Sequence, residues 1–242
     1  MVEYGTVHLL FLAASAVFIS GGMLLASRLS RRGQNILFFA AAVGCAGLIF
    51  FTCGMGLTLK GGINWLGLAR QMLQVCQFNM ILVFLMLVPR FELARQYSVY
   101  FSMFAAFTTF VSVPDSYQGL EWYDLSLVTF WLFHLLAIAL PLWMVAARRL
   151  KPQKRYALPV AACVFGYFTV VYMISEVLMR RGLMTVETSH SFIYKSGDTF
   201  PLKQLFDLIK IPYVYLLPLI PLMIVFFFAL SWAFRNYKTG KF

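Results

Sequence analysis

Charged residues are scarce in this chain. Of its 242 residues, 12% are charged and only nine are acidic, whereas soluble domains carry about a quarter charged residues and about half apolar ones. The hydrophobic share is 61% and the aromatic share is 17%. This composition excludes an ordinary soluble domain and predicts an integral membrane protein.

The motifs that hold nucleotides, zinc or a catalytic serine are missing as well. The sequence contains no phosphate-binding glycine loop, dinucleotide fingerprint, HExxH or GxSxG. Its four cysteines, Cys45, Cys53, Cys76 and Cys163, have neither the spacing of a zinc site nor that of a disulfide framework. We therefore expect no cofactor and no metal site.

The positive net charge of +11 does not indicate nucleic acid as a partner. The cations gather at the ends of apolar stretches and form no stripe interleaved with aromatic residues. Anionic lipid headgroups are the simpler partner. Membrane lipids are therefore the expected partners, with a membrane-protein partner as a further option.

Seven apolar stretches can cross a hydrocarbon core of about 30 Å. We predict an all-α, polytopic membrane helix bundle with seven transmembrane helices, forming a single domain over residues 1–242. The predicted spans are Thr6–Ala26, Ile36–Leu59, Met72–Val88, Ser98–Val113, Leu125–Ala147, Leu158–Leu178 and Ile211–Phe234. The fourth span is short, about 24 Å at the helical rise. Small residues such as Gly44 and Gly47 predict a central place for the second.

The distribution of Lys and Arg predicts the orientation. The start, "MVEYGTVH", lacks a positive n-region, so the first span is interpreted as an anchor with its N-terminus outside. The C-terminus is then cytoplasmic, and thirteen of the twenty Lys and Arg residues fall on the cytoplasmic side. The extracytoplasmic stretch 179–207 is long enough to act as a lid or binding element.

Polar residues interrupt the third span in "LQVCQFNMILVF", residues 73–84. Gln74 and Gln77 are three residues apart and share a helix face, with Cys76 and Asn79 beside them. Polar groups at this depth must find partners in protein or in a wet cavity. Hydrogen bonds that hold the helices together would explain Gln and Asn equally well.

Polar groups from several spans fall in the outer half of the predicted bundle. Cys76 lies about 6 Å and His134 about 13 Å below the start of their spans. We therefore predict one polar pocket that binds a ligand, lined by Gln74, Gln77, Asn79, His8, Glu176, Tyr172 and Tyr213. Two structural alternatives stay open: His134 as a neutral, hydrogen-bonded ring, and Glu176 paired with Arg180 one turn later.

Several segments resemble the YwaF-like family of bacterial integral membrane proteins. "QMLQVCQF" resembles its "LPLHLCDI"-type motif, and "TFWLFHLLAIALPLWMV" resembles its "FFLHHGLLILAPLYLV" helix. "YFSMFAAFTTFVSVPD" and "DLIKIPYVYLLPLIPLMIVFFFAL" resemble two further segments of the family, so the resemblance covers nearly the whole chain in order. The chain departs from the motif at three positions. Met72 stands where the family has proline, Gln74 where histidine is common, and Gln77 where an acidic residue is common. The resemblance implies a bacterial plasma membrane location.

The same resemblance supplies a catalytic hypothesis. The family is distantly similar to eukaryotic membrane lipid acyltransferases and androgen-induced-type hydrolases, which pair an intramembrane Cys or Thr nucleophile with a histidine. It implies Cys76 as the nucleophile and His134 as the base. Two hypotheses follow. The first is a protein that binds or transports a lipid or small molecule, alone or as a subunit of a larger membrane complex. The second is a lipid acyltransferase or hydrolase. A distance above about 6 Å between the Cys76 sulfur and the His134 ring would favour the first.

Overall fold

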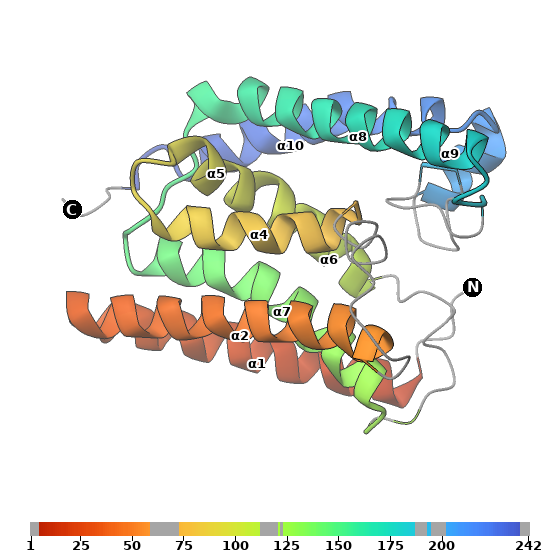
Figure 1. Ribbon diagram of the computed structural model, residues 1–242. Coiled ribbons are helices and arrows are strands. Elements are labelled where there is room, and N and C mark those ends of the chain that lie inside the picture. The colour runs from red at the N-terminus through yellow and green to blue at the C-terminus, as the bar shows by residue number, and fades with distance from the viewer. Residues whose placement is uncertain are drawn as a thin grey trace.

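The computed structural model describes residues 5–58, 73–111, 121, 123–186, 193–194 and 202–237. Every regular element in this part of the chain is a helix. The α-helices are α1 (Thr6–Arg28), α2 (Arg31–Thr58), α4 (Val75–Leu87), α5 (Glu92–Tyr97), α6 (Met103–Val111), α7 (Leu125–Ala146), α8 (Ala157–Arg180), α9 (Leu202–Ile209) and α10 (Leu219–Ala233). A π-helix, η1 (Ser98–Ser102), joins α5 to α6, and short 3-10 helices, η3 (Lys154–Tyr156) and η4 (Val214–Leu216), precede α8 and α10. The long helices run side by side (Figure 1).

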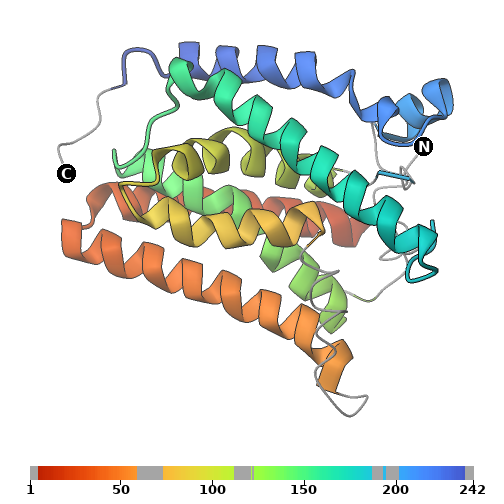
Figure 2. The same cartoon turned by 45° about the horizontal axis from the view of Figure 1, so that its top comes forward.

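The centre of the bundle is α7. It contacts α1, α2, α4, η1 and α6, while α8 packs with α10 on the side away from α1 and α2 (Figures 1 and 2). In its most apolar stretch 72% of the residues are buried, against 11% in α1. The second helix, which was predicted to be central, contacts α7 and α4 but exposes Ile36 and Phe39 on its other side, so the central place belongs to α7 and not to α2.

Gly22 allows α1 to approach α7 closely. A Cβ atom at Gly22 would lie 2.2 Å from Cε2 of the Trp143 indole. The indole Nε1–H donates a hydrogen bond to the Ile19 carbonyl oxygen at 3.1 Å. Trp143 is only 4% exposed, so a side chain at position 22 forces a buried ring to move.

We expect Gly22→Ala to lower the free energy of unfolding by about 1–3 kcal/mol, the usual cost of overpacking. Gly21→Ala is the matched control, because nothing lies within 4 Å of a Cβ at Gly21. Both changes gain the same helix propensity, so the difference between them isolates the clash. Thermal unfolding in detergent measures it, and equal unfolding temperatures for the two variants would contradict this packing.

Among the residues that the structure describes, four helical segments are long and apolar enough to cross a membrane: His8–Arg28, Leu127–Ala146, Lys154–Arg180 and Val214–Ala233. The all-α class is confirmed for the described residues. The count of seven spans and the orientation stay predictions, as does the assignment of residues 1–242 to a single domain.

The fourth predicted span begins earlier in the structure than the sequence indicated. α5, η1 and α6 follow one another without a break from Glu92 to Val111. The side chain of Gln96 is fully buried, and its Nε2 donates to Glu92 Oε1 at 2.7 Å and to the Lys151 carbonyl at 2.8 Å. These hydrogen bonds satisfy a polar group that hydropathy had placed outside the helix, so the helical run is longer than predicted.

The last predicted span begins later than expected. Lys210 and Tyr213 have positive φ angles of 52° and 64°, a conformation that non-glycine residues seldom adopt. Pro212 and Pro218 lack the amide hydrogen that a helix interior requires. The continuous helix therefore starts at Leu219 rather than near Ile211.

The stretch 179–207 is more structured than predicted. It includes most of α9, and Ile193 and Tyr194 pack in a hydrophobic cluster with Val171 of α8 and Tyr215. Residues 187–192 and 195–201 of this stretch lie outside the described residues. The proposal that it forms a lid stays a prediction.

One end of the bundle gathers the α1–α2, α4–α5 and α7–α8 connections (Figure 1). Arg149 donates to Asn35 Oδ1 at 3.0 Å, and Arg95 donates to the Arg149 carbonyl oxygen. Burial, together with the charges of Arg31 and Arg95, lowers the pKa of Arg149. These contacts tie the three connections together in a region rich in positive charge.

Candidate functional site

Cys76 lies in the first turn of α4. The preceding Gln74 caps this helix with an extended backbone, and its carbonyl oxygen accepts a hydrogen bond from the Phe78 N–H at 3.0 Å. The amides of Val75, Cys76 and Gln77 come before this bond and point out of the helix N-terminus. Cys76 is a free, half-buried thiol. A helix N-terminus favours negative charge, so these amides are placed to donate hydrogen bonds to an anionic oxygen beside Cys76.

His134 lies in the middle of α7, with its ring only 5% exposed. The rings of Phe130 and Phe133 pack against it, with centroids 4.5 and 5.2 Å away. Nδ1 is 2.8 Å from the Phe130 carbonyl oxygen. A carbonyl oxygen only accepts hydrogen bonds, so Nδ1 carries the proton and Nε2 of the neutral ring is left as the acceptor.

The two side chains meet between α4 and α7. Nε2 of His134 lies 3.2 Å from Sγ of Cys76, within hydrogen-bond reach. With Nε2 as the acceptor, the thiol is the donor. The Phe130 carbonyl oxygen orients the imidazole, a role for which the sequence had offered no residue. The candidate nucleophile, the candidate base and a carbonyl group that orients this base therefore form one hydrogen-bonded row.

Two predicted ligand-binding residues lie close to Cys76 in α4. Asn79 follows Cys76 by three residues and so shares its helix face, and it is only 3% exposed. The side-chain oxygens Gln77 Oε1 and Asn79 Oδ1 are buried and have no hydrogen-bond partner among the described residues. Gln74 is half-buried directly before the helix. Their role in binding stays a prediction.

His8 packs on α7 through Trp131. The two ring centroids are 5.3 Å apart, and Trp131 also stacks on Phe11 at 5.1 Å. Trp131 precedes His134 by three residues, so His8 contacts the turn of α7 next to the catalytic candidate. The structure thus places His8 near the predicted site, in contact with an aromatic ring.

The remaining predicted residues form a separate aromatic cluster on α8. Tyr172 stacks on Tyr213 at 5.1 Å and on Tyr194 at 5.8 Å. The Tyr194 hydroxyl donates to Glu176 Oε1 at 2.5 Å, and Glu176 also pairs with Arg180 at 3.6 Å. Burial and the contact with Glu176 raise the pKa of Tyr194, so this phenol stays a neutral donor. The described contacts of Tyr172, Glu176 and Tyr213 do not include Cys76 or His134, so their place in one pocket with the cysteine–histidine pair stays a prediction.

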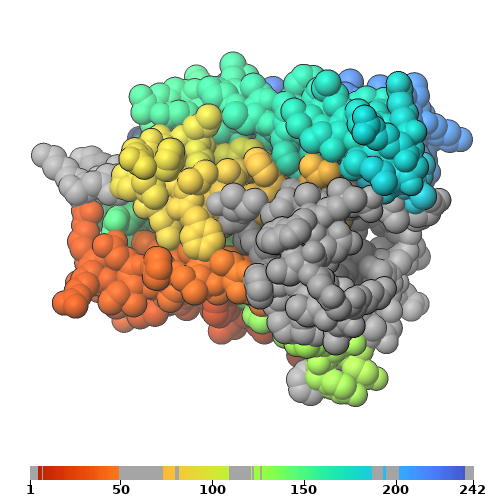
Figure 3. All heavy atoms as spheres, in the orientation of Figure 1, coloured from red at the N-terminus to blue at the C-terminus, as the bar shows by residue number. Residues whose placement is uncertain are grey.

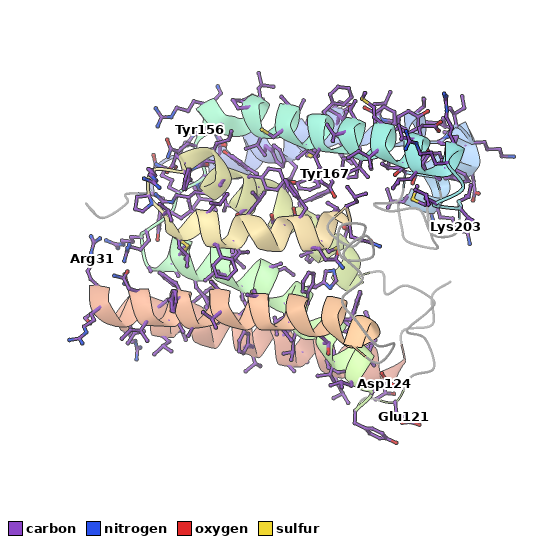
Figure 4. All side chains as sticks on the ribbon, in the orientation of Figure 1. Arg31, Glu121, Asp124, Tyr156, Tyr167 and Lys203 are labelled. Atoms are coloured by element: carbon purple, nitrogen blue, oxygen red, sulfur yellow. The ribbon has the colours of Figure 1, made fainter. Side chains whose placement is uncertain are left out.

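Tyr167 links α8 to the start of α4, a role that the sequence analysis missed. Its hydroxyl donates to the Leu73 carbonyl oxygen at 2.7 Å, and its ring stacks on Phe78 at 4.4 Å. Figure 4 shows its side chain between the two helices. The chain that enters the Cys76 turn is thus held from the α8 side, while His134 contacts the sulfur from α7. No signal in the sequence distinguishes Tyr167 from Tyr172, the other tyrosine of that span.

These elements define a helical membrane protein with a cysteine–histidine pair inside its bundle. The model of the TMEM164 family matches residues 3–232. The chain therefore belongs to the TMEM164 family, a family of transmembrane proteins. Among the curated proteins and among the solved structures, nothing matches. The resemblance to the YwaF-like family and the bacterial plasma membrane location stay predictions.

Proposed function

We propose that this protein is a membrane enzyme that transfers or hydrolyses the acyl group of a lipid, with Cys76 as the nucleophile and His134 as the base. The observation that carries this proposal is the 3.2 Å distance between Sγ and Nε2. It is well below the separation of about 6 Å above which catalysis would be disfavoured. The distance favours catalysis over a binding or transport function without covalent chemistry.

In the first half-reaction, His134 Nε2 takes the thiol proton while Sγ attacks the carbonyl carbon of a lipid ester. The tetrahedral intermediate collapses when the bond between this carbon and the ester oxygen breaks. The imidazolium then gives its proton to the departing alkoxide. The products are a thioester on Cys76 and a lipid alcohol that has lost one acyl chain.

The oxyanion of the intermediate forms beside the N-terminus of α4. Backbone amides that precede the first hydrogen bond of a helix are suitable donors to such an oxygen. The amides of Cys76 and Gln77 occupy this place next to the sulfur. Donors of this kind typically contribute about 10²–10³-fold to the rate.

In the second half-reaction, His134 Nε2 takes a proton from an acceptor hydroxyl, whose oxygen attacks the thioester carbonyl. The bond to sulfur breaks, and the thiolate recovers the proton from the imidazolium. A lipid alcohol as acceptor gives a new ester, and water gives a free fatty acid. The buried oxygens Gln77 Oε1 and Asn79 Oδ1 are suited to accept hydrogen bonds from an acceptor, whether it is a lipid alcohol or water.

The location of the pair supports a lipid as the substrate. His134 lies within the membrane-spanning segment Leu127–Ala146, and the half-buried Cys76 packs against the hydrophobic core. An acyl chain can reach this position laterally from the bilayer, whereas a polar substrate would have to give up its water.

The experiment that tests the function uses the purified protein in phosphatidylcholine vesicles that contain a phospholipid with a fluorescent acyl chain. We expect the fluorescent chain to appear on an added lysophospholipid or as free fatty acid, and a thiol-reactive lipid probe to label Cys76. Labelling should slow when His134 is replaced. A folded protein that binds the lipid without turnover and without His134-dependent labelling would support binding or transport instead.

Tyr167→Phe is expected to lower kcat on the order of tenfold with little change in KM, because small misplacements of reacting groups are costly. The change removes the hydroxyl that donates to the Leu73 carbonyl and keeps the ring that stacks on Phe78. Tyr172→Phe is the matched control on the same helix, outside the contacts of α4. Steady-state kinetics in vesicles measure both, and an unchanged kcat for Tyr167→Phe would rule out this positioning role.

A further inference from the structure

A cavity of about 380 Å³ lies between α4, α5 and α8. Its walls include Phe78 and Leu82 of α4, Ala94 and Tyr97 of α5 and Cys163 of α8, and the exposed Arg90 lies at its edge. The α4–α5 corner forms part of the molecular surface between α2 and α8 (Figure 3). The volume is within the range of about 300–1,000 Å³ typical of ligand sites.

This cavity is separate from the cysteine–histidine pair. Residues two positions apart in a helix do not face the same way, so Cys76 and Phe78 point to different sides of α4. Cys76 contacts His134 of α7, whereas Phe78 contacts Tyr97 at 6.2 Å and Tyr167 at 4.4 Å between ring centroids. An inference about the cavity therefore does not depend on the proposed enzyme function.

One residue of the cavity wall, Tyr97, carries a buried hydroxyl group. Tyr97 is 3% exposed, and its OH has no hydrogen-bond partner among the described residues. A buried polar group without a partner is unfavourable, and the rest of the wall is almost entirely apolar. An occupant with an acyl chain would cover the apolar wall, and a hydrogen-bond acceptor on the same occupant would pair with the Tyr97 hydroxyl.

The charges at the edge of the cavity favour an anionic occupant. The carboxylate of Glu92 already has partners within the protein. It accepts hydrogen bonds from Arg95 at 3.1 Å, Gln96 at 2.7 Å and Gln153 at 2.8 Å. Arg90 lies over the ring of Phe91 at 5.0 Å, and no carboxylate lies within salt-bridge distance of it in the part of the chain that the structure describes. The positive charge of Arg90 is therefore available to a ligand.

We infer that this cavity binds a phospholipid with an anionic headgroup. One acyl chain lies along Phe78 and Leu82, an ester oxygen accepts a hydrogen bond from the Tyr97 hydroxyl, and the headgroup phosphate pairs with Arg90. The surrounding end of the bundle is cationic, with Arg31 and Tyr156 marking it in Figure 4. Guanidinium groups suit phosphate because they donate in a planar fork.

The experiment uses the full-length protein in phosphatidylcholine vesicles that carry a trace of a photoactivatable lipid. The reactive group sits in the acyl chain of phosphatidylglycerol in one sample and of phosphatidylcholine in the other. Mass spectrometry quantifies crosslinks to the peptide that contains Leu82 and to the one that contains Val225, whose exposed side chain on α10 reports general contact with lipid. For each probe we take the ratio of Leu82 crosslinks to Val225 crosslinks. We expect this ratio to be at least about fivefold higher with the phosphatidylglycerol probe than with the phosphatidylcholine probe.

Arg90→Gln should reduce the factor between the two probes' ratios to about one, while Arg155→Gln should leave this factor unchanged. Arg155 is the matched control because it lies at the same end and stacks on Tyr156 at 4.9 Å, away from the cavity wall. Tyr97→Phe should lower the Leu82 crosslink yield of the phosphatidylglycerol probe. Both arginine variants should unfold at the wild-type temperature. Equal preference for the two probes, or a preference that survives Arg90→Gln, overturns the inference.

Discussion

Cys76→Ala is expected to reduce acyl transfer by about 10⁴-fold or more, because removal of a catalytic nucleophile eliminates the covalent route. The thiol is half-buried and packs against the core, so its loss should lower stability only modestly. Lipid binding should persist, since the surrounding wall is unchanged. The measurement is the rate of acyl exchange in vesicles, with lipid retention measured on the same preparation.

Cys163→Ala is the control for this loss. Cys163 is an exposed thiol on α8, outside the contacts of the catalytic pair, so its replacement should leave the rate unchanged. Cys76→Ser should fall between the two, because serine keeps the shape but is a weaker nucleophile at neutral pH. Wild-type turnover in Cys76→Ala would remove Cys76 from the mechanism.

His134→Gln is expected to lower kcat by about 10²–10⁴-fold, the usual contribution of a positioned general base. Glutamine keeps a polar side chain next to the rings of Phe130 and Phe133, but it cannot take the thiol proton. KM should change little, because the imidazole acts on the proton rather than on the lipid chain. Steady-state kinetics separate the two quantities.

The two catalytic residues should act as one unit. In the double variant Cys76→Ala/His134→Gln, the rate should be no lower than in Cys76→Ala alone, because the base has no function without the nucleophile. Two losses that multiply would indicate that His134 supports the activity without serving Cys76. Wild-type kcat in His134→Gln would leave the 3.2 Å contact as a structural hydrogen bond.

The sequence predicted which segments form helices better than it predicted where some of these helices begin. The bounds of α1, α7 and α8 agree with the predicted spans within three residues, because each is a long apolar run that ends in polar residues. Hydropathy failed at Arg95 and Gln96, which are buried inside the helical run from Glu92. Glu92 in the preceding turn accepts a hydrogen bond from each of them, but their other partners come from the α7–α8 connection, and no local pattern reveals these.

The catalytic candidates came from a family resemblance, and the depth estimate from the residues alone separated them by about 7 Å, a little over one helical turn. Cys76 is the second residue of α4, whereas His134 is the tenth of α7. An offset of eight residues corresponds to about 12 Å along a helix. The pair meets because the N-terminal end of α7 extends beyond the start of α4, as Figure 1 shows. A single sequence does not indicate how far one helix is shifted along its neighbour.

The predicted pocket grouped its residues by depth alone. Tyr172 and Glu176 were placed at a suitable depth, but depth does not determine which side of a helix faces the site. On α8 these residues pack with Tyr194 and Tyr213, while Tyr167 of the same helix reaches α4. The packing partners of α8 decide which side chains approach Cys76.

The most direct test of the central claim is the mass of Cys76 during turnover. The protein is mixed with phospholipid in vesicles, quenched in acid within a turnover, digested and analysed by mass spectrometry. We predict that the peptide with Cys76 carries one acyl group, that hydroxylamine removes it, and that His134→Gln does not accumulate it. Continued lipid turnover with Cys76 unmodified at every time point, or an acyl group found on another residue, would contradict the account.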